Sequence, residues 1–183
     1  MNKHETIAKL MNDYGTSVLH LTYSYVRNRQ TSEDLTQEIF IKCFEKLDSF
    51  KGNSSIQTWL YRIAVNHCKD YVKSWNYRKV YITDYISSFL RENQSGAEEQ
   101  FLKRSEKNEL IDAVFKLPIK YREIIFLYYF HECSQKEISE IYQLNINTVK
   151  SRLSKGKELL RKSLVERGVE YGEEIQRDEK SNA

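Results

Sequence analysis

Residues 134–164 read SQKEISEIYQLNINTVKSRLSKGKELLRKSL, and this stretch decides the fold of the C-terminal half of the chain. Ser134 and Glu137 have the spacing of a capping box, which predicts that a helix begins directly after Ser134. The polar turn QLNIN ends that helix, and Asn147 can cap a second helix that begins near Thr148. A short helix, a tight turn and a longer helix together predict a helix-turn-helix.

The longer helix of this pair has two faces. Apolar residues at helical spacing are expected to pack inward: Val149, Leu153, Leu159, Leu160 and Leu164. The outer face groups side chains that can bond bases with cations that can contact phosphates: Thr148, Lys150, Ser151, Arg152 and Lys155. A merely solvated basic helix is the alternative. The capping box, the short turn and a net charge of 7 − 3 = +4 over residues 134–164 favour DNA binding.

The N-terminal part of the chain is also expected to be helical. Apolar residues recur at helical spacing over residues 33–50, which predicts an amphipathic helix. Two more helical segments are expected before it, with breaks near Gly15 and around residues 28–32. Residues 51–58, KGNSSIQT, then predict a short loop.

The segment after this loop combines aromatic and basic residues. An apolar stripe runs from Trp59 to Trp75, and another face of the predicted helix carries Arg62, Asn66, Lys69 and Lys73. Residues 59–79 have a net charge of 5 − 1 = +4. Cations interleaved with aromatic rings favour binding of unstacked single-stranded nucleic acid, although most aromatic residues on a helix, such as Trp59, pack in a core.

Composition limits the fold and the chemistry. A chain of 183 residues with only one Pro and six Gly favours an all-α fold. Its three cysteines are widely spaced, which indicates buried thiols in a reducing compartment rather than disulfides or a zinc site. No phosphate-binding loop or catalytic constellation occurs, so we expect neither an enzyme nor a bound cofactor or metal.

The pattern divides the chain into two domains. We expect one helical domain over residues 1–79, a flexible linker over 80–105, a second helical domain over 106–168 and a disordered acidic tail over 169–183. Pro118 suits the first turn of a helix in the second domain. A cytoplasmic protein is expected, because no apolar run of membrane-spanning length and no N-terminal signal pattern is seen.

Two longer segments resemble a known family. Residues 34–72, DLTQEIFIKCFEKLDSFKGNSSIQTWLYRIAVNHCKDYV, resemble the sigma-2 domain of extracytoplasmic-function (ECF) sigma factors of the sigma-70 family. Residues 117–162, LPIKYREIIFLYYFHECSQKEISEIYQLNINTVKSRLSKGKELLRK, resemble their sigma-4 domain. This resemblance implies a specificity subunit that binds core RNA polymerase and recognises a promoter through two helical domains.

The resemblance also assigns roles to residues. Docking on the clamp coiled coil of the polymerase β′ subunit would fall to Asp34, Gln37 and Glu38. Residues 49–58 match the loop that captures a base flipped out of the −10 element. Contacts to that element are expected from Phe50, Lys51, Asn53, Ser54, Ser55, Arg62, Asn66, Lys69, Lys73 and Trp75. The double-stranded −35 element would be read by Thr148, Lys150, Ser151, Arg152 and Lys155.

The implied partners are therefore core RNA polymerase, through its β′ and β subunits, promoter DNA and an anti-sigma factor that is often linked to the membrane. The sequence departs from the family pattern in the turn, where QLN lacks the usual Gly and Ser139 replaces the usual Ala. Asn145 is expected to relieve the resulting strain by adopting a left-handed conformation. A stand-alone helix-turn-helix regulator and, far below it, an RNA-binding or nucleic-acid-modifying enzyme remain the alternatives.

Overall fold

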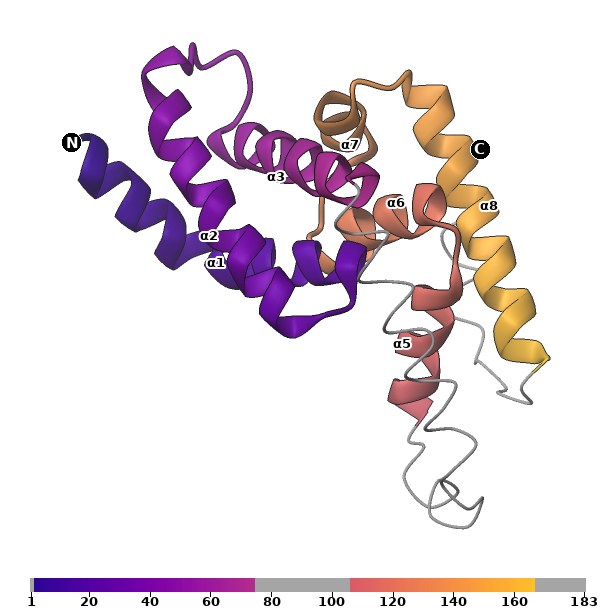
Figure 1. The fold of residues 1–183 in the computed structure, drawn as a ribbon. Helices are drawn as coiled ribbons and strands as arrows, with labels where there is room; N and C mark the ends of the chain where they lie inside the picture. Colours follow the sequence, from indigo (N-terminus) through magenta and orange to yellow (C-terminus); the bar gives the residue numbers. More distant parts are fainter. Residues whose placement is uncertain (1, 75–105, 167–183) are drawn as a thin grey trace.

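The computed structural model describes residues 2–74 and 106–166, and these residues form helices without any strand (Figure 1). The first domain contains α1 (Lys3–Val26), α2 (Arg29–Lys46), the short 3₁₀-helix η1 (Leu47–Ser49) and α3 (Ile56–Lys73). The second contains α5 (Glu106–Lys116), α6 (Ile119–Phe130), α7 (Gln135–Tyr142) and α8 (Ile146–Val165). The all-α prediction is confirmed. Trp75, the linker over 80–105 and the tail over 169–183 lie outside the described residues.

The first domain packs α1 against both α2 and α3. The predicted break near Gly15 is wrong, because α1 continues through this residue. A glycine inside a helix lowers its stability by about 1 kcal/mol relative to alanine. Burial of the nearby apolar face of α1 outweighs this loss. Val18 and Leu21 on that face are fully buried. The chain turns only at Arg27, with a left-handed φ of 55°, and the Asn28 side chain then caps α2 by accepting from the Thr31 N–H at 2.9 Å.

The capping box of the helix-turn-helix is confirmed. The Ser134 hydroxyl accepts from the Glu137 N–H at 3.2 Å, and the Glu137 carboxylate accepts from the Ser134 N–H at 2.8 Å. These two bonds satisfy N–H groups that the first turn of α7 would otherwise leave unpaired. The start of α7 directly after Ser134 therefore follows from the local sequence.

The turn after α7 differs from the prediction at two residues. The cap of α8 is Asn145 rather than Asn147, and its side chain accepts from the Asn147 N–H at 2.8 Å. A capping residue needs an extended backbone, so Asn145 does not adopt the expected left-handed conformation. Gln143 adopts it instead, with φ 54°. The Ser139 hydroxyl donates a hydrogen bond to the Leu144 carbonyl and so links α7 to the turn, a contact that alanine could not make.

Helix α6 lies at the centre of the molecule, where it contacts α1 of the first domain and α8 of the second. Pro118 is its N-cap, one position before the predicted first turn. The middle of the helix, residues 122–127, is buried, including Arg122 and Glu123. Gly156 of α8 allows a close approach, because a Cβ there would meet Ile125 Cγ1 at 3.0 Å. An apolar helix that is covered on several sides is expected to lie in a core.

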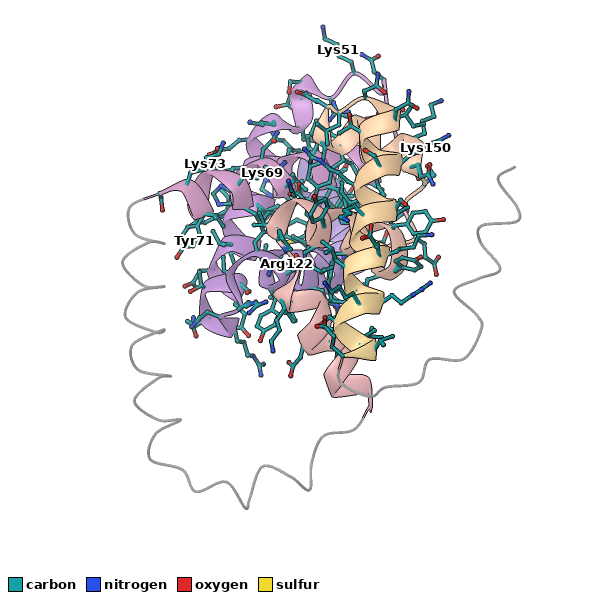
Figure 2. The ribbon with its side chains drawn as sticks, turned by 90° about the vertical axis from the view of Figure 1, so that its right-hand side faces the viewer. Lys51, Lys69, Tyr71, Lys73, Arg122 and Lys150 are labelled. Carbon is teal, nitrogen blue, oxygen red and sulfur yellow. The ribbon has the colours of Figure 1, made fainter. Side chains whose placement is uncertain are left out.

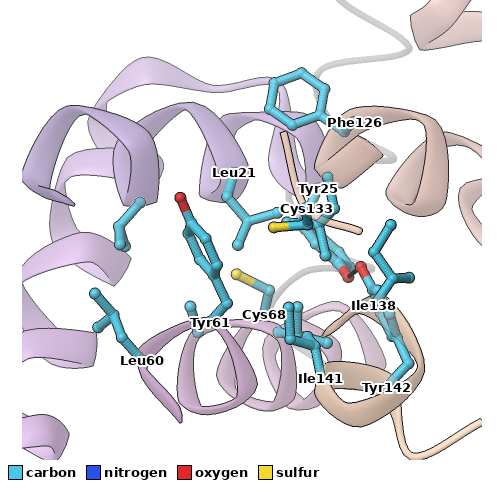
Figure 3. Close-up of a cluster of buried hydrophobic side chains, with 14 of the residues drawn as sticks. Leu21, Tyr25, Leu60, Tyr61, Cys68, Phe126, Cys133, Ile138, Ile141 and Tyr142 are labelled. Atoms are coloured by element: carbon cyan, nitrogen blue, oxygen red, sulfur yellow. Dashed lines mark hydrogen bonds between the residues drawn. The ribbon is translucent and has the colours of Figure 1, made fainter. Parts of the chain in front are cut away.

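The two domains share one hydrophobic core. Buried side chains of α1 and α3 meet those of α6, α7 and the segment between them, as Figure 3 shows for Leu21, Tyr25, Tyr61 and Cys68 of the first domain and Phe126, Cys133, Ile138, Ile141 and Tyr142 of the second. All three cysteines are free and buried, as the sequence predicted. The described helices therefore pack as a single body, in which α3 lies against α7 and α1 against α6.

Candidate nucleic-acid interface

The residues predicted to dock on the polymerase lie together on an exposed face of α2. Asp34, Gln37 and Glu38 are all exposed. Asp34 accepts a hydrogen bond from the Gln30 side chain at 3.3 Å. Glu38 is held at 2.6 Å from Nε2 of His67 on α3. This contact holds the Glu38 carboxylate beside α3, while the side chain stays exposed to solvent.

A hollow of about 270 Å³ lies beside this face, between α2 and α3. Both helices contribute to its lining, which includes three cations, an aromatic ring and an amide. The lining residues are Lys42, Lys46, Trp59, Arg62, Ile63, Asn66, His67 and Asp70. The Nε of Arg62 is buried and has no hydrogen-bond partner among the described residues. Cations beside an aromatic face can hold a phosphate and a stacked base at the same time.

The hollow combines residues that the sequence assigns to the −10 element with residues that it does not. Arg62 and Asn66 of α3 belong to the first group, and Lys42, Lys46 and Trp59 to the second. Lys42 and Lys46 stand four residues apart on α2, so their spacing already places them on one side of that helix. Only the crossing of α2 and α3 brings these lysines opposite Arg62, and the sequence of neither helix contains that information.

The loop between η1 and α3 places its predicted DNA residues in different environments. Phe50 packs against Trp59 with a ring separation of 5.2 Å, and Lys51 and Asn53 are exposed. Figure 2 shows Lys51 at the end of the molecule. Ser54 is half-buried, and Ser55 caps α3 by accepting from the Thr58 N–H at 3.0 Å. Ser55 therefore fixes the end of the loop by capping α3.

The predicted cationic face of α3 is divided. Asn66 and Lys73 are exposed, while Lys69 is half-buried and lies 3.6 Å from the Glu123 carboxylate of α6. Figure 2 shows Lys69 and Lys73 on α3 and Lys150 on α8. Arg62 and Asn66 thus line the hollow, whereas Lys69 faces the second domain.

The exposed side of α8 agrees with the predicted recognition face in most positions. Lys150, Ser151 and Lys155 are exposed, and Val149 is fully buried, as the apolar periodicity indicated. Within the helix, Ser151 donates to the Thr148 carbonyl at 3.1 Å and Lys155 pairs with Glu158 at 2.6 Å. Arg152 differs from the prediction. Its Nη1 lies 3.7 Å from Glu123, so the guanidinium turns back toward α6 rather than fully outward.

Residues 2–74 and 106–166 contain neither a cluster of metal-ligating side chains nor a helix able to span a membrane. No cluster of three or more His, Cys, Asp or Glu side chains there can hold a metal ion. Likewise, none of the described helices has the length and apolar character needed to cross a membrane. His67 and Cys68 do not share a function, because His67 pairs with Glu38 while Cys68 is buried in the shared core.

A helix-turn-helix domain joined to a helical domain with a cation-lined hollow defines a two-domain DNA-binding protein. The model of sigma-70 region 2 matches residues 10–76, and that of sigma-70 region 4 matches residues 107–160. The chain therefore belongs to the sigma-70 family, as an RNA polymerase sigma factor of the ECF group that functions in transcription initiation.

Individual relatives agree with this family. The chain is 34% identical over 167 residues to the ECF RNA polymerase sigma factor SigW of Bacillus subtilis, a match that covers 87% of this chain and 89% of that protein. It is 30% identical over 169 residues to the sigma factor SigV of the same organism, covering 90% and 97%. The fold is similar to that of CnrH in complex with the cytosolic domain of CnrY, with a TM-score of 0.63, 21% identity and 88% of each chain covered.

Proposed function

We propose that the two domains of this sigma factor bind different elements of the promoter. The exposed Asp34, Gln37 and Glu38 of α2 dock on the β′ clamp coiled coil of core RNA polymerase. The hollow beside them accepts an unpaired nucleotide of the −10 element, and the N-terminal part of α8 enters the major groove at the −35 element. The chain contributes no catalysis of its own, because the polymerase carries out the chemistry.

The observation that best supports this proposal is the position of the hollow. Lys42, Lys46 and Arg62 supply positive charge around Trp59 and Asn66, directly beside the docking face of α2. Flipping a base costs a few kcal/mol of stacking and pairing, which a ring, an amide and nearby cations can offset. A nucleotide held here would lie next to the polymerase, where strand opening is needed.

Regulation by an anti-sigma factor belongs to the same proposal. The solved relatives include the sigma factor RpoE of Bartonella quintana in complex with the anti-sigma factor NepR, which covers 87% of this chain at a TM-score of 0.62. We expect a partner of this kind to occupy the docking and DNA-binding surfaces of the present chain, in the cytoplasm or at the inner face of the membrane.

Separate variants of the two domains test the proposal. In the holoenzyme, Arg152→Ala should weaken recognition of the −35 element by about 1–3 kcal/mol, because a base or phosphate contact is lost, while the affinity for core polymerase stays unchanged. Asp34→Ala combined with Gln37→Ala should weaken core binding, and Asp13→Ala, an exposed carboxylate on α1, is the control. Loss of core binding in Arg152→Ala, with normal binding in the α2 variant, would reverse the assignment.

A further inference from the structure

His67 of α3 lies between the hollow and the docking face of α2, which consists of Asp34, Gln37 and Glu38. Its Nε2 is 2.6 Å from Oε2 of Glu38, and its side chain also belongs to the lining of the hollow. The side chain of His67 is 14% exposed, whereas that of Glu38 is 56% exposed. The imidazole is therefore held in the packing between the two helices, and the carboxylate is presented to solvent.

The docking residues differ in how they are held. Asp34 accepts a hydrogen bond from Gln30, four residues earlier on the same helix, at 3.3 Å. Glu38 instead contacts a residue that comes 29 positions later in the chain, on a second helix. Because α2 and α3 pack against each other, the position of the Glu38 carboxylate is set by tertiary structure and not by α2 alone.

The contact engages one oxygen of the Glu38 carboxylate. An ionised carboxylate only accepts hydrogen bonds, so Nε2 of His67 is the donor to Oε2. The other oxygen, Oε1, has no hydrogen-bond partner among residues 2–74 and 106–166. Since each carboxylate oxygen can accept hydrogen bonds of its own, a donor of a binding partner can still reach Oε1. His67 therefore orients the carboxylate without occupying it fully.

Orientation of Glu38 before docking changes the free energy of docking. Glutamate has several rotatable bonds, and holding its side chain in one orientation costs conformational entropy. A chain in which His67 already orders Glu38 does not lose this entropy again when it binds its partner. Ordering one such side chain in advance is expected to raise an affinity by about twofold to tenfold.

We propose that His67 is a positioning residue for polymerase docking, which holds the Glu38 carboxylate in the orientation that core RNA polymerase binds. The inference rests on the proposed function, in which Glu38 docks on the β′ subunit. Although His67 borders the hollow, little of its side chain reaches solvent and its Nε2 is already bonded to Glu38. It acts through Glu38, and the affinity for −10 DNA does not depend on it.

A double-mutant cycle on the full-length chain tests the proposal, with binding to immobilised core RNA polymerase measured by surface plasmon resonance. His67→Ala should weaken binding about fivefold, within the range for one ordered side chain. Glu38→Ala should weaken it at least as much. Adding His67→Ala to Glu38→Ala should cause no further loss, because no carboxylate remains to be held. The control is His20→Ala, which removes an exposed imidazole from α1 and should bind as the native chain does.

Two further measurements separate positioning from a folding defect and from DNA contact. His67→Gln should bind core polymerase within about twofold of the native chain, because its amide N–H can donate to Glu38. A holoenzyme formed with saturating His67→Ala should bind single-stranded −10 DNA as tightly as the native holoenzyme. Unchanged core affinity in His67→Ala, additive losses in the cycle, no rescue by His67→Gln, or weaker DNA binding by the saturated holoenzyme would each overturn the proposal.

Failure of this inference is distinguishable from failure of the proposed function. The combined Asp34→Ala and Gln37→Ala variant tests the docking face without altering His67 or Glu38. If that variant loses core affinity and His67→Ala does not, the docking face stands and the positioning role is overturned. If neither variant loses core affinity, the docking face itself is wrong, and the inference is overturned with it.

Discussion

The hollow between α2 and α3 and the cluster around the buried Glu123 of α6 use the same kinds of side chain in opposite environments. The cluster consists of Tyr25, Lys69, Glu123, Tyr142 and Arg152. In the hollow, Lys46 and Arg62 surround Trp59 beside open solvent. In the cluster, Lys69 and Arg152 face a buried carboxylate beside Tyr142. The cations of the hollow line an open surface, and those of the cluster are held by an anion of the chain itself. One helix, α3, contributes to both.

Shortening a side chain of the shared core should have the largest effect. Ile141 of α7 is 1% exposed and belongs to the core that joins the domains. Ile141→Ala should lower the free energy of unfolding by about 2–5 kcal/mol, because it removes buried methyl groups and leaves a cavity. Ile41→Ala on α2, where the side chain is 58% exposed, is the matched control. Urea denaturation measures both, and equal losses would contradict a shared core.

Neutralising the hollow should affect nucleic-acid binding rather than stability. Arg62→Met preserves most of the side-chain stem but removes a charged donor from the lining of the hollow. The affinity of the holoenzyme for single-stranded −10 DNA should fall roughly tenfold to a hundredfold, the effect of losing about 1.5–3 kcal/mol from one charged hydrogen bond. Fluorescence anisotropy gives the affinity. Lys9→Met, an exposed cation on α1, should change it far less, and an equal change would remove the hollow from the proposed site.

The interface should also respond to acid through His131. This residue follows α6 and packs against Tyr61 of α3, whose hydroxyl lies 3.3 Å from Nδ1, and against Phe126. Burial, together with the nearby His20 of α1, lowers the pKa of His131 from 6.5 to about 4.

Since the folded chain prefers neutral His131, its stabilising effect is complete above pH 6.5 and is lost as the pH falls from about 6.5 toward 4. Unfolding free energies measured across this range should decline toward acid in the native chain and decline less in His131→Phe. Identical slopes in the two chains would show that His131 is not buried against Tyr61 as described.

The sequence predicted the elements better than their contacts. The capping box at Ser134, the burial of Val149 and the exposure of Lys150 all follow from spacing along one helix, and the structure confirms them. The break expected near Gly15 is wrong because the packing of α1 on other helices outweighs the preference of a single residue. The spacing of apolar residues predicts which face of a helix is buried. Tertiary contacts decide whether a weak helix-breaking residue ends the helix.

The contacts of the candidate site could not be predicted from the pattern of any single helix. Lys69 and Arg152 lie on the polar faces of their helices, so their spacing predicted contact with DNA alone. Their shared partner is Glu123, which lies in the largely apolar helix α6 and gave no signal of function in the sequence. Only the packing of α3, α6 and α8 brings these charges together. The roles proposed for Asp34, Gln37 and the hollow remain predictions for the variants described above.

The most direct measurement of the central claim is transcription reconstituted from the purified chain, core RNA polymerase and a library of promoter fragments. The account predicts a stable holoenzyme that starts transcription from fragments with two separated elements, duplex upstream and melted downstream. A chain that binds one palindromic duplex equally well with or without polymerase, and starts no transcript, would contradict it.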